Sequence, residues 1–415
     1  MPELFASYPR AISGLRKAGA IGDSLTADAV GNGWTNWGWL AWARRYLNDR
    51  LDISTANVFA VGGATVSDVR TLQLPQALAA NLDICFVMCG QNSLDGDPAS
   101  TAAIWADLQA IYDELLQHGA FVPAILMRVH GSAAPQSADV VFQASALNRL
   151  IIEYARSRSS MLVIDLNPLY LDFATGQAIS DFLRDGIHDN QPSAKAGGRV
   201  IADGVSAAIP AFDDRFSVLG DTYDAVKNPR GNLLANGLLS GTGGGVANGA
   251  SGTVAASWSL QRNANSGASA AGSKQAVAGY TNLEAQRITI GGTSDGTGLV
   301  LASEDLITNV SEGDVLQAEM QASWNLSTAD IIGIGLNLVY YNAGFGIVTQ
   351  TWDGYFSPSN GALPSGSDSV IFKTEPLAVP SGVSHIFLAG AVQAPASGSP
   401  SGTIDFSRAS VRKVI

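Results

Sequence analysis

The chain has 415 residues, more than one ordinary hydrophobic core organises, so two domains are expected. Its hydrophobic share of 46% excludes wholesale disorder, and a net charge of −12 with only 24 Lys and Arg residues argues against a nucleic-acid partner. The longest apolar runs, such as 84–89 and 121–127, are far shorter than the roughly 20 residues of a membrane-spanning helix, so no membrane span is expected.

The N-terminal stretch lacks the apolar core of a Sec-type signal peptide. None is therefore expected, which leaves a cytoplasmic location, a virion-associated one or export by another route.

From residue 17 to residue 210, short apolar runs alternate with amphipathic stretches. Strands are predicted at 17–21, 57–61, 83–88, 121–127 and 161–166. Helices are predicted near 36–50, 66–80, 99–118, 137–158 and 193–209. This alternation is typical of a parallel sheet covered by helices on both faces, a three-layer α/β/α domain that binds ligands at the carboxyl ends of its strands.

Cys85 and Cys89 are predicted to lie four positions apart in one strand, with their Cα atoms roughly 13 Å from each other. This separation is too long for a disulfide, so both are expected to be buried thiols.

The alternating pattern stops near residue 212, and the turn-rich stretch 213–230 is predicted to be a linker. From 231 to 415, Gly, Ser, Ala, Thr and Asn dominate and no helix signal is found. Short β-like runs occur at 253–260, 287–290, 314–320, 333–341 and 385–390. This half is predicted to be an all-β sandwich.

Only four histidines occur, and one has a suggestive neighbour. Asp185 precedes His188 by three positions, a spacing at which a carboxylate can accept the imidazole Nδ1–H and leave Nε2 as a base. His130 closes the fourth predicted strand, at the ligand-binding edge, and is a candidate contact with the substrate. His118 is expected to cap the C-terminus of its helix, where a cation is favourable. His385 is expected to be structural.

Ser24 follows the first predicted strand, so its hydroxyl is expected at the carboxyl edge of the sheet. The same position would also suit an ordinary helix N-cap. The residues around Ser24 do not form the G-x-S-x-G turn of α/β-hydrolases.

Four short motifs in order resemble the blocks of the SGNH/GDSL hydrolase family: GlyAspSerLeu at 22–25, AlaValGlyGlyAlaThr at 60–65, CysGlyGlnAsnSer at 89–93 and AspGlyIleHis at 185–188. The resemblance covers about 1–212 and implies a flavodoxin-like α/β/α fold. It implies a triad of Ser24, His188 and Asp185.

An oxyanion hole follows from the same resemblance, formed by the N–H groups of Ser24 and Gly63 (with Gly62 as the alternative) and the Asn92 amide. Neither a metal nor an organic cofactor is implied. Two positions depart from the family pattern: Ser93 stands where an Asp is usual, and Asp189 stands where a Pro often follows the histidine.

Several tryptophans follow the nucleophile motif. Trp39 and Trp42 fit a helix core, whereas Trp34 lies among turn residues and is a candidate wall of an acyl or sugar pocket. The start of the second half loosely resembles jelly-roll carbohydrate-binding modules. Its candidate sugar-stacking residues are Trp258, Trp324, Trp352 and Tyr355.

Three functional hypotheses follow. The first is a serine esterase that removes O-acyl groups, in particular acetyl, from a carbohydrate, with a virion-borne glycan deacetylase of a phage tail as one version. The second is a general short-chain esterase, lipase or thioesterase whose β domain forms a homo-oligomer. The third is a non-enzymatic glycan-binding or structural virion protein.

Overall fold

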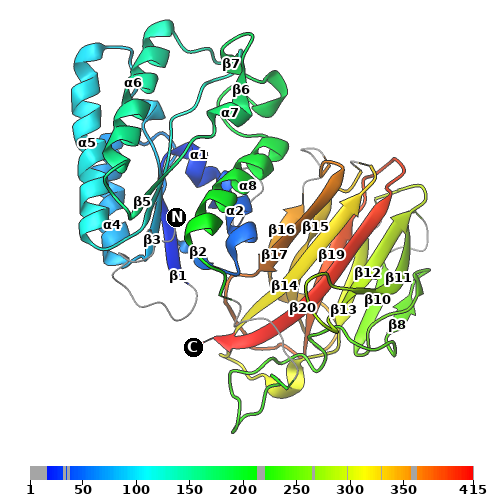
Figure 1. Ribbon diagram of the computed structural model, residues 1–415. Helices are drawn as coiled ribbons and strands as arrows, with labels where there is room; N and C mark the ends of the chain where they lie inside the picture. Colours follow the sequence, from blue (N-terminus) through cyan, green and yellow to red (C-terminus); the bar gives the residue numbers. More distant parts are fainter. Residues whose placement is uncertain are drawn as a thin grey trace. The chain divides into compact units, whose positions relative to one another are not determined.

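The computed structural model describes residues 16–30, 34, 38–212, 220–263, 267–296, 298–328, 330–356 and 362–414. The chain folds as two compact units, Met1–Phe212 and Asp213–Ile415 (Figure 1). Among the described residues, no helix combines the length and the apolar character needed to cross a bilayer.

The first unit contains a parallel sheet with the strand order β2-β1-β3-β4-β5. This order is the doubly wound, flavodoxin-like one. The strands are β1 (Arg16–Gly22), β2 (Leu51–Val58), β3 (Ile84–Met88), β4 (Val122–Ile125) and β5 (Met161–Ile164). The predicted α/β/α fold is confirmed.

Helices cover both faces of this sheet, in blue to green in Figure 1. One face packs on α2 (Trp39–Leu47) and α8 (Gln191–Ala208), and the other on α4 (Leu74–Ala79), α5 (Pro98–Gln117) and α6 (Ala138–Ala155). The central strand β3 supplies both cores because its side chains alternate: Phe86 faces the first layer and Val87 the second. Cys85 and Cys89 are free and buried.

Shorter elements complete the unit. They are α1 (Ser24–Ala27), α3 (Val66–Asp68), a π-helical turn (Val69–Gln73), α7 (Asn167–Tyr170) and the hairpin of β6 (Leu171–Asp172) and β7 (Gln177–Ala178), with 3-10 turns at Asp28–Val30, Gln91–Ser93 and Ser180–Phe182.

Two predicted elements of this unit are wrong in position or continuity. The strand predicted at 57–61 corresponds to β2, which begins earlier, at Leu51. The first part of β2 was not predicted because an edge strand with one solvent-exposed face has no continuous apolar run. The single helix predicted at 66–80 is broken into three pieces. Pro75 lies in the first turn of the last piece and cannot continue a helical hydrogen-bond ladder from the π turn.

The second unit is a sandwich of two mainly antiparallel sheets whose strands run β16-β15-β19-β13-β10-β8 and β17-β14-β20-β12-β11-β9 in the described residues, with β18 paired to β14. The strands are β8 (Gly245–Ala247), β9 (Ser251–Gly252), β10 (Trp258–Arg262), β11 (Ser269–Ala276), β12 (Glu284–Gly291), β13 (Gly298–Ser303), β14 (Val315–Leu326), β15 (Gly333–Tyr341), β16 (Ile347–Phe356), β17 (Gly366–Lys373), β18 (Leu377–Ala378), β19 (His385–Gln393) and β20 (Gly402–Val414). A 3-10 turn lies at Ile307–Asn309. The predicted all-β second half is confirmed.

Within this unit, the strand predicted at 253–260 begins only at Trp258, because Ser257 adopts a left-handed backbone (φ 64°) in the preceding turn. Strand β11 had no signal in the sequence, since its small side chains form no apolar run.

Candidate active site

The nucleophile motif folds into a tight turn at the end of β1. Gly22 has a positive φ of 156°, and a Cβ there would lie 2.2 Å from the Met88 carbonyl oxygen, so only glycine fits. Gln73 holds this glycine from both sides, accepting from its N–H (2.8 Å) and donating to its carbonyl (2.9 Å). Asp23, not Ser24, caps α1 by accepting from the Leu25 N–H, so the Ser24 hydroxyl is not used as the cap.

The loop before α8 brings a histidine to this serine. His188 Nε2 lies 2.8 Å from Ser24 Oγ, and its Nδ1 lies 2.7 Å from Asp185 Oδ2. In the tautomer with its proton on Nδ1, the imidazole donates to the carboxylate and accepts from the serine hydroxyl.

Asp185 is fixed by its own loop. Its Oδ1 accepts from the N–H groups of Ile187 (3.0 Å) and His188 (2.8 Å). Partial burial alone would raise the pKa of Asp185, but these two bonds and the bond to the imidazole lower it to about 2. The carboxylate is thus ionised over the whole range in which proteins normally work.

The second and third motifs meet beside the serine. Gly63 has a left-handed φ of 78°, and a Cβ at Gly62 would lie 3.9 Å from the Ser24 Cβ. Asn92 lies in the 3-10 turn after β3, and its Nδ2 donates to the Ala64 carbonyl at 3.1 Å. The loop of Gly63 and the amide of Asn92 are therefore tied together on the same side of the sheet.

The two departures from the family pattern both have partners in the structure. Ser93 Oγ accepts from the Val66 N–H at 2.9 Å and so secures the start of α3. Asp189 is buried and pairs with Arg128, with 2.5 Å between Oδ1 and Nη1.

Residues 20–195 match the sequence model of the GDSL-like lipase/acylhydrolase family. The N-terminal domain belongs to this family. The protein is accordingly a serine carboxylic-ester hydrolase. A search of curated proteins found no match to the chain.

Three solved structures similar to the GDSL-like domain illustrate how low the sequence identity is. An acetyl xylan esterase is 16% identical (TM-score 0.38; 46% of this chain and 99% of that chain covered). An acetylxylan esterase from Geobacillus stearothermophilus is also 16% identical (TM-score 0.38; 48% and 97% covered). A protein named TesA is 19% identical (TM-score 0.36; 46% and 99% covered).

The two candidate substrate contacts have different surroundings in the structure. Trp34 is 2% exposed, packs in the core of the GDSL-like domain and lies under the Arg44 guanidinium at 4.5 Å, so it does not wall a pocket in this arrangement. His130 lies in the loop after β4, where its Nδ1 contacts the Ala134 carbonyl (3.2 Å). Burial lowers the pKa of His130 and favours a neutral ring.

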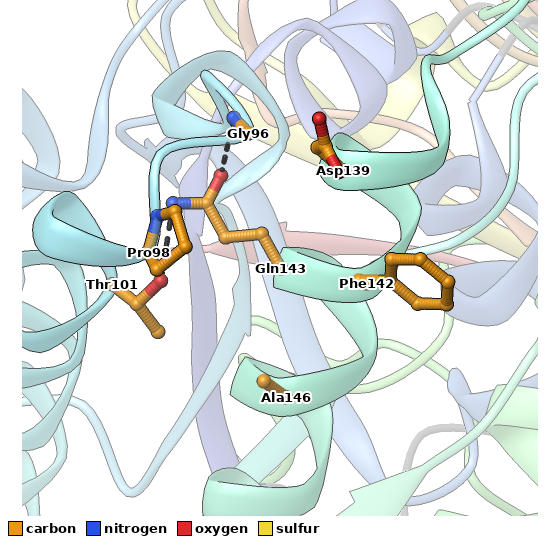
Figure 2. Close-up of a pocket in the computed structure, with 7 residues that line it drawn as sticks. All are labelled: Gly96, Pro98, Thr101, Asp139, Phe142, Gln143 and Ala146. Carbon is orange, nitrogen blue, oxygen red and sulfur yellow. Dashed lines mark hydrogen bonds between the residues drawn. The ribbon is translucent and has the colours of Figure 1, made fainter.

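A surface pocket of about 260 Å³ lies between the start of α5 and α6 (Figure 2). None of its lining residues belongs to the triad; they are Gly96, Pro98, Thr101, Asp139, Phe142, Gln143 and Ala146. Gln143 fills one wall of the pocket with its amide, which accepts from the N–H groups of Asp95 and Gly96 and so holds the loop that follows Asn92.

Three of the four aromatics considered for sugar stacking are buried in the sandwich: Trp258, Trp324 and Tyr355. Trp352 is partly exposed on the edge strand β16, where its ring meets Phe356 edge to face. Among the described residues, no group of three or more His, Cys, Asp or Glu side chains could hold a metal ion.

Three residues that support the site belong to no motif and were not predicted: Arg128, Gln73 and Gln143. Arg128 had a readable signal, because a cation directly after a buried apolar strand needs a buried partner. The glutamines had none, since amides have no fixed partner that sequence spacing reveals.

Proposed function

We propose that the protein is a serine esterase that removes O-acyl groups, in particular acetyl, from a carbohydrate through an acyl-enzyme. The observation that carries the proposal is the continuous hydrogen-bonded line from Ser24 Oγ through the His188 ring to Asp185, with steps of 2.8 and 2.7 Å. A serine hydroxyl is a weak nucleophile on its own, and this line supplies the base that activates it.

In the first half of the proposed reaction, Ser24 Oγ attacks the ester carbonyl while His188 Nε2 accepts its proton. The Asp185 carboxylate stabilises the imidazolium that forms. The imidazolium then protonates the leaving alcohol, and the acyl group stays on Ser24. In the second half, His188 takes a proton from water, which attacks the acyl-enzyme and releases the acid.

Negative charge on the tetrahedral intermediate needs donors that are already in place. The Ser24 N–H begins α1, where helical N–H groups have no partner within the helix. Gly63 lies in the adjoining loop, and Asn92 carries a second amide hydrogen besides the one donated to Ala64. These three donors form the proposed oxyanion hole.

The exposure of the residues around Ser24 supports an ester substrate whose alcohol portion is large. Val61, Gly62 and Gly63 are exposed, a Cβ at Gly63 would have no neighbour within 4 Å, and the Asp185 side chain is 49% exposed. A polysaccharide can therefore stay outside while a single acyl group reaches Ser24. The β sandwich, with Trp352 partly exposed, would hold the polymer.

The test compares wild type with Ser24→Ala on p-nitrophenyl esters from acetate to octanoate and on an acetylated polysaccharide. We expect hydrolysis by wild type only, fastest with acetate, together with acetate release from the polymer. Equal rates for the two proteins would refute Ser24 as the nucleophile. A preference for octanoate without acetate release would favour a general esterase or lipase whose β domain assembles subunits.

Trp352→Ala tests the role of the β sandwich separately. We expect slower release from the polymer with an unchanged rate on p-nitrophenyl acetate. Unchanged rates on both substrates would remove Trp352 from the proposal.

A further inference from the structure

A buried guanidinium lies directly behind the loop that carries His188. Arg128 follows β4 and is 2% exposed. Its Nη1 lies 2.5 Å from Asp189 Oδ1, and its Nη2 donates to the Ile187 carbonyl at 3.0 Å. The acceptors belong to the residues immediately before and after His188: the backbone carbonyl of Ile187 and the side-chain carboxylate of Asp189. One guanidinium therefore binds both neighbours of the histidine.

One oxygen of the Asp189 carboxylate accepts more than one hydrogen bond. Besides Arg128, its Oδ1 accepts from the Tyr170 hydroxyl at 2.8 Å, and the Arg128 guanidinium stacks over the Tyr170 ring at 4.5 Å. All three side chains are buried. A buried ion pair repays its desolvation only when further hydrogen bonds satisfy both groups. Here the guanidinium also donates to the Ile187 carbonyl, and the carboxylate also accepts from the neutral Tyr170 hydroxyl.

We propose that Arg128 and Asp189 are positioning residues that hold the His188 imidazole between Ser24 and Asp185. The inference rests on the proposed function. The position of Asp189 is one where the family often has a proline, whose fixed φ would stiffen the same backbone. In this protein the buried Arg128–Asp189 ion pair restricts the backbone instead.

The backbone of the loop is compatible with this exchange. Leu183 and Asp189 form an antiparallel bridge, whose hydrogen bonds run from the Arg184 N–H to the His188 carbonyl (2.9 Å) and from the Asn190 N–H to the Phe182 carbonyl (3.2 Å). Neither bond uses the Asp189 N–H. A proline at this position would remove no bond of the bridge.

The geometry also explains why the cation is an arginine. A lysine ammonium on its flexible stem cannot present two N–H groups in a fixed plane to the Asp189 carboxylate and the Ile187 carbonyl. Arg128→Lys would keep the charge and lose the double grip.

The experiment measures kcat and KM for p-nitrophenyl acetate, and the melting temperature, for four variants: Asp189→Asn, Arg128→Lys, the double variant Arg128→Met/Asp189→Pro, and Asp405→Asn. The last is the matched control, because it breaks the bidentate Arg287–Asp405 pair of the β unit. For the two single substitutions at the positioning pair we expect kcat to fall by about 10²-fold at nearly constant KM, as for a misplaced catalytic group. The double variant should regain most of the loss.

Recovery in the double variant would show that the lost rate came from the position of the imidazole. A folded Asp189→Asn protein with wild-type kcat would overturn the inference, as would a double variant no faster than the single ones despite a wild-type melting temperature. If Ser24→Ala were as active as wild type, the proposed function would fail whatever the pair does. If Ser24→Ala were inactive while the variants at Arg128 and Asp189 kept the wild-type kcat, the positioning role alone would fail.

Discussion

His188 Nε2 lies 2.8 Å from Ser24 Oγ, although 164 positions separate the two residues in the chain. The contact joins the first strand of the sheet to the loop before its last helix. It therefore exists only when the whole GDSL-like domain has folded, and activity should be a sensitive report of its integrity.

Substituting Asp185 by Asn tests the orientation of the imidazole. An amide cannot hold the proton on Nδ1 as the carboxylate does, so kcat should fall by about 10⁴-fold while the domain stays folded. Asp172→Asn is the matched control, because Asp172 makes the same kind of turn contact, accepting from the Ala174 N–H at 2.9 Å. Steady-state kinetics on p-nitrophenyl acetate decide; a drop below tenfold for Asp185→Asn would speak against the triad.

Alanine at Gly63 tests the proposed oxyanion hole. Gly63 and Gly176 have left-handed φ values of 78° and 71°, and an added Cβ meets nothing within 4 Å at either position. Both alanine variants should therefore lose a similar stability, about 1 kcal/mol, from backbone strain. Only Gly63→Ala should lose kcat, by about 10²-fold, because its N–H shifts away from the intermediate. Equal kcat values in the two variants would exclude the Gly63 N–H as a donor.

The carboxyl of Asp23 predicts a pH dependence of stability. Burial raises its pKa from 3.8 to about 6, against the opposing effects of the Leu25 N–H and Arg128. Its Oδ2 is buried without a hydrogen-bond partner among the described residues. Because the folded protein holds this proton more tightly than the unfolded chain, the contribution of Asp23 to stability is fully present below about pH 4. It is lost as the pH rises through about 6, by on the order of 3 kcal/mol in total.

Asp23→Asn should remove that loss, since asparagine also caps helices and carries no charge. Urea unfolding of both proteins between about pH 4 and pH 7 measures the difference. The variant should gain on wild type as the pH rises; two parallel curves would show that Asp23 titrates alike in the folded and unfolded states.

Gln143→Leu tests the support of the loop after Asn92. The leucine would leave the N–H groups of Asp95 and Gly96 without their acceptor. Because these bonds are only partly buried, we expect a cost of about 1 kcal/mol for each lost bond. Phe142→Ala is the control on the same helix, because Phe142 is 70% exposed and its removal should change the free energy of unfolding by less than about 0.5 kcal/mol. Urea denaturation measures both, and equal effects would contradict the supporting role.

Many helices and strands could be predicted from the sequence because their apolar patterns are local. Fully buried strands such as β3 and β4 have continuous apolar runs, and α5 and α6 have long amphipathic patterns, so their predicted positions agree with the structure within a few residues. Edge strand β2 and the small-residue strand β11 have neither signal. The prediction for Trp34 was wrong because local sequence does not reveal tertiary packing. The turn residues around it predict an exposed side chain, but the core of the domain buries it.

The sequence by itself determined which residue types form the site and in what order they occur. Each is required for a specific property, such as a tight turn, a nucleophile, a base or a hydrogen-bond donor, and so stands in a recognisable motif: Gly22, Ser24, Asn92, Asp185 and His188. Only the tertiary structure decided how they are supported. The grip of Arg128 on both neighbours of His188, and of Gln73 on Gly22, joins segments that have no periodic relation along the chain. Such contacts form where the packed sheet leaves a buried polar group to be satisfied, and that need arises only after the layers have come together.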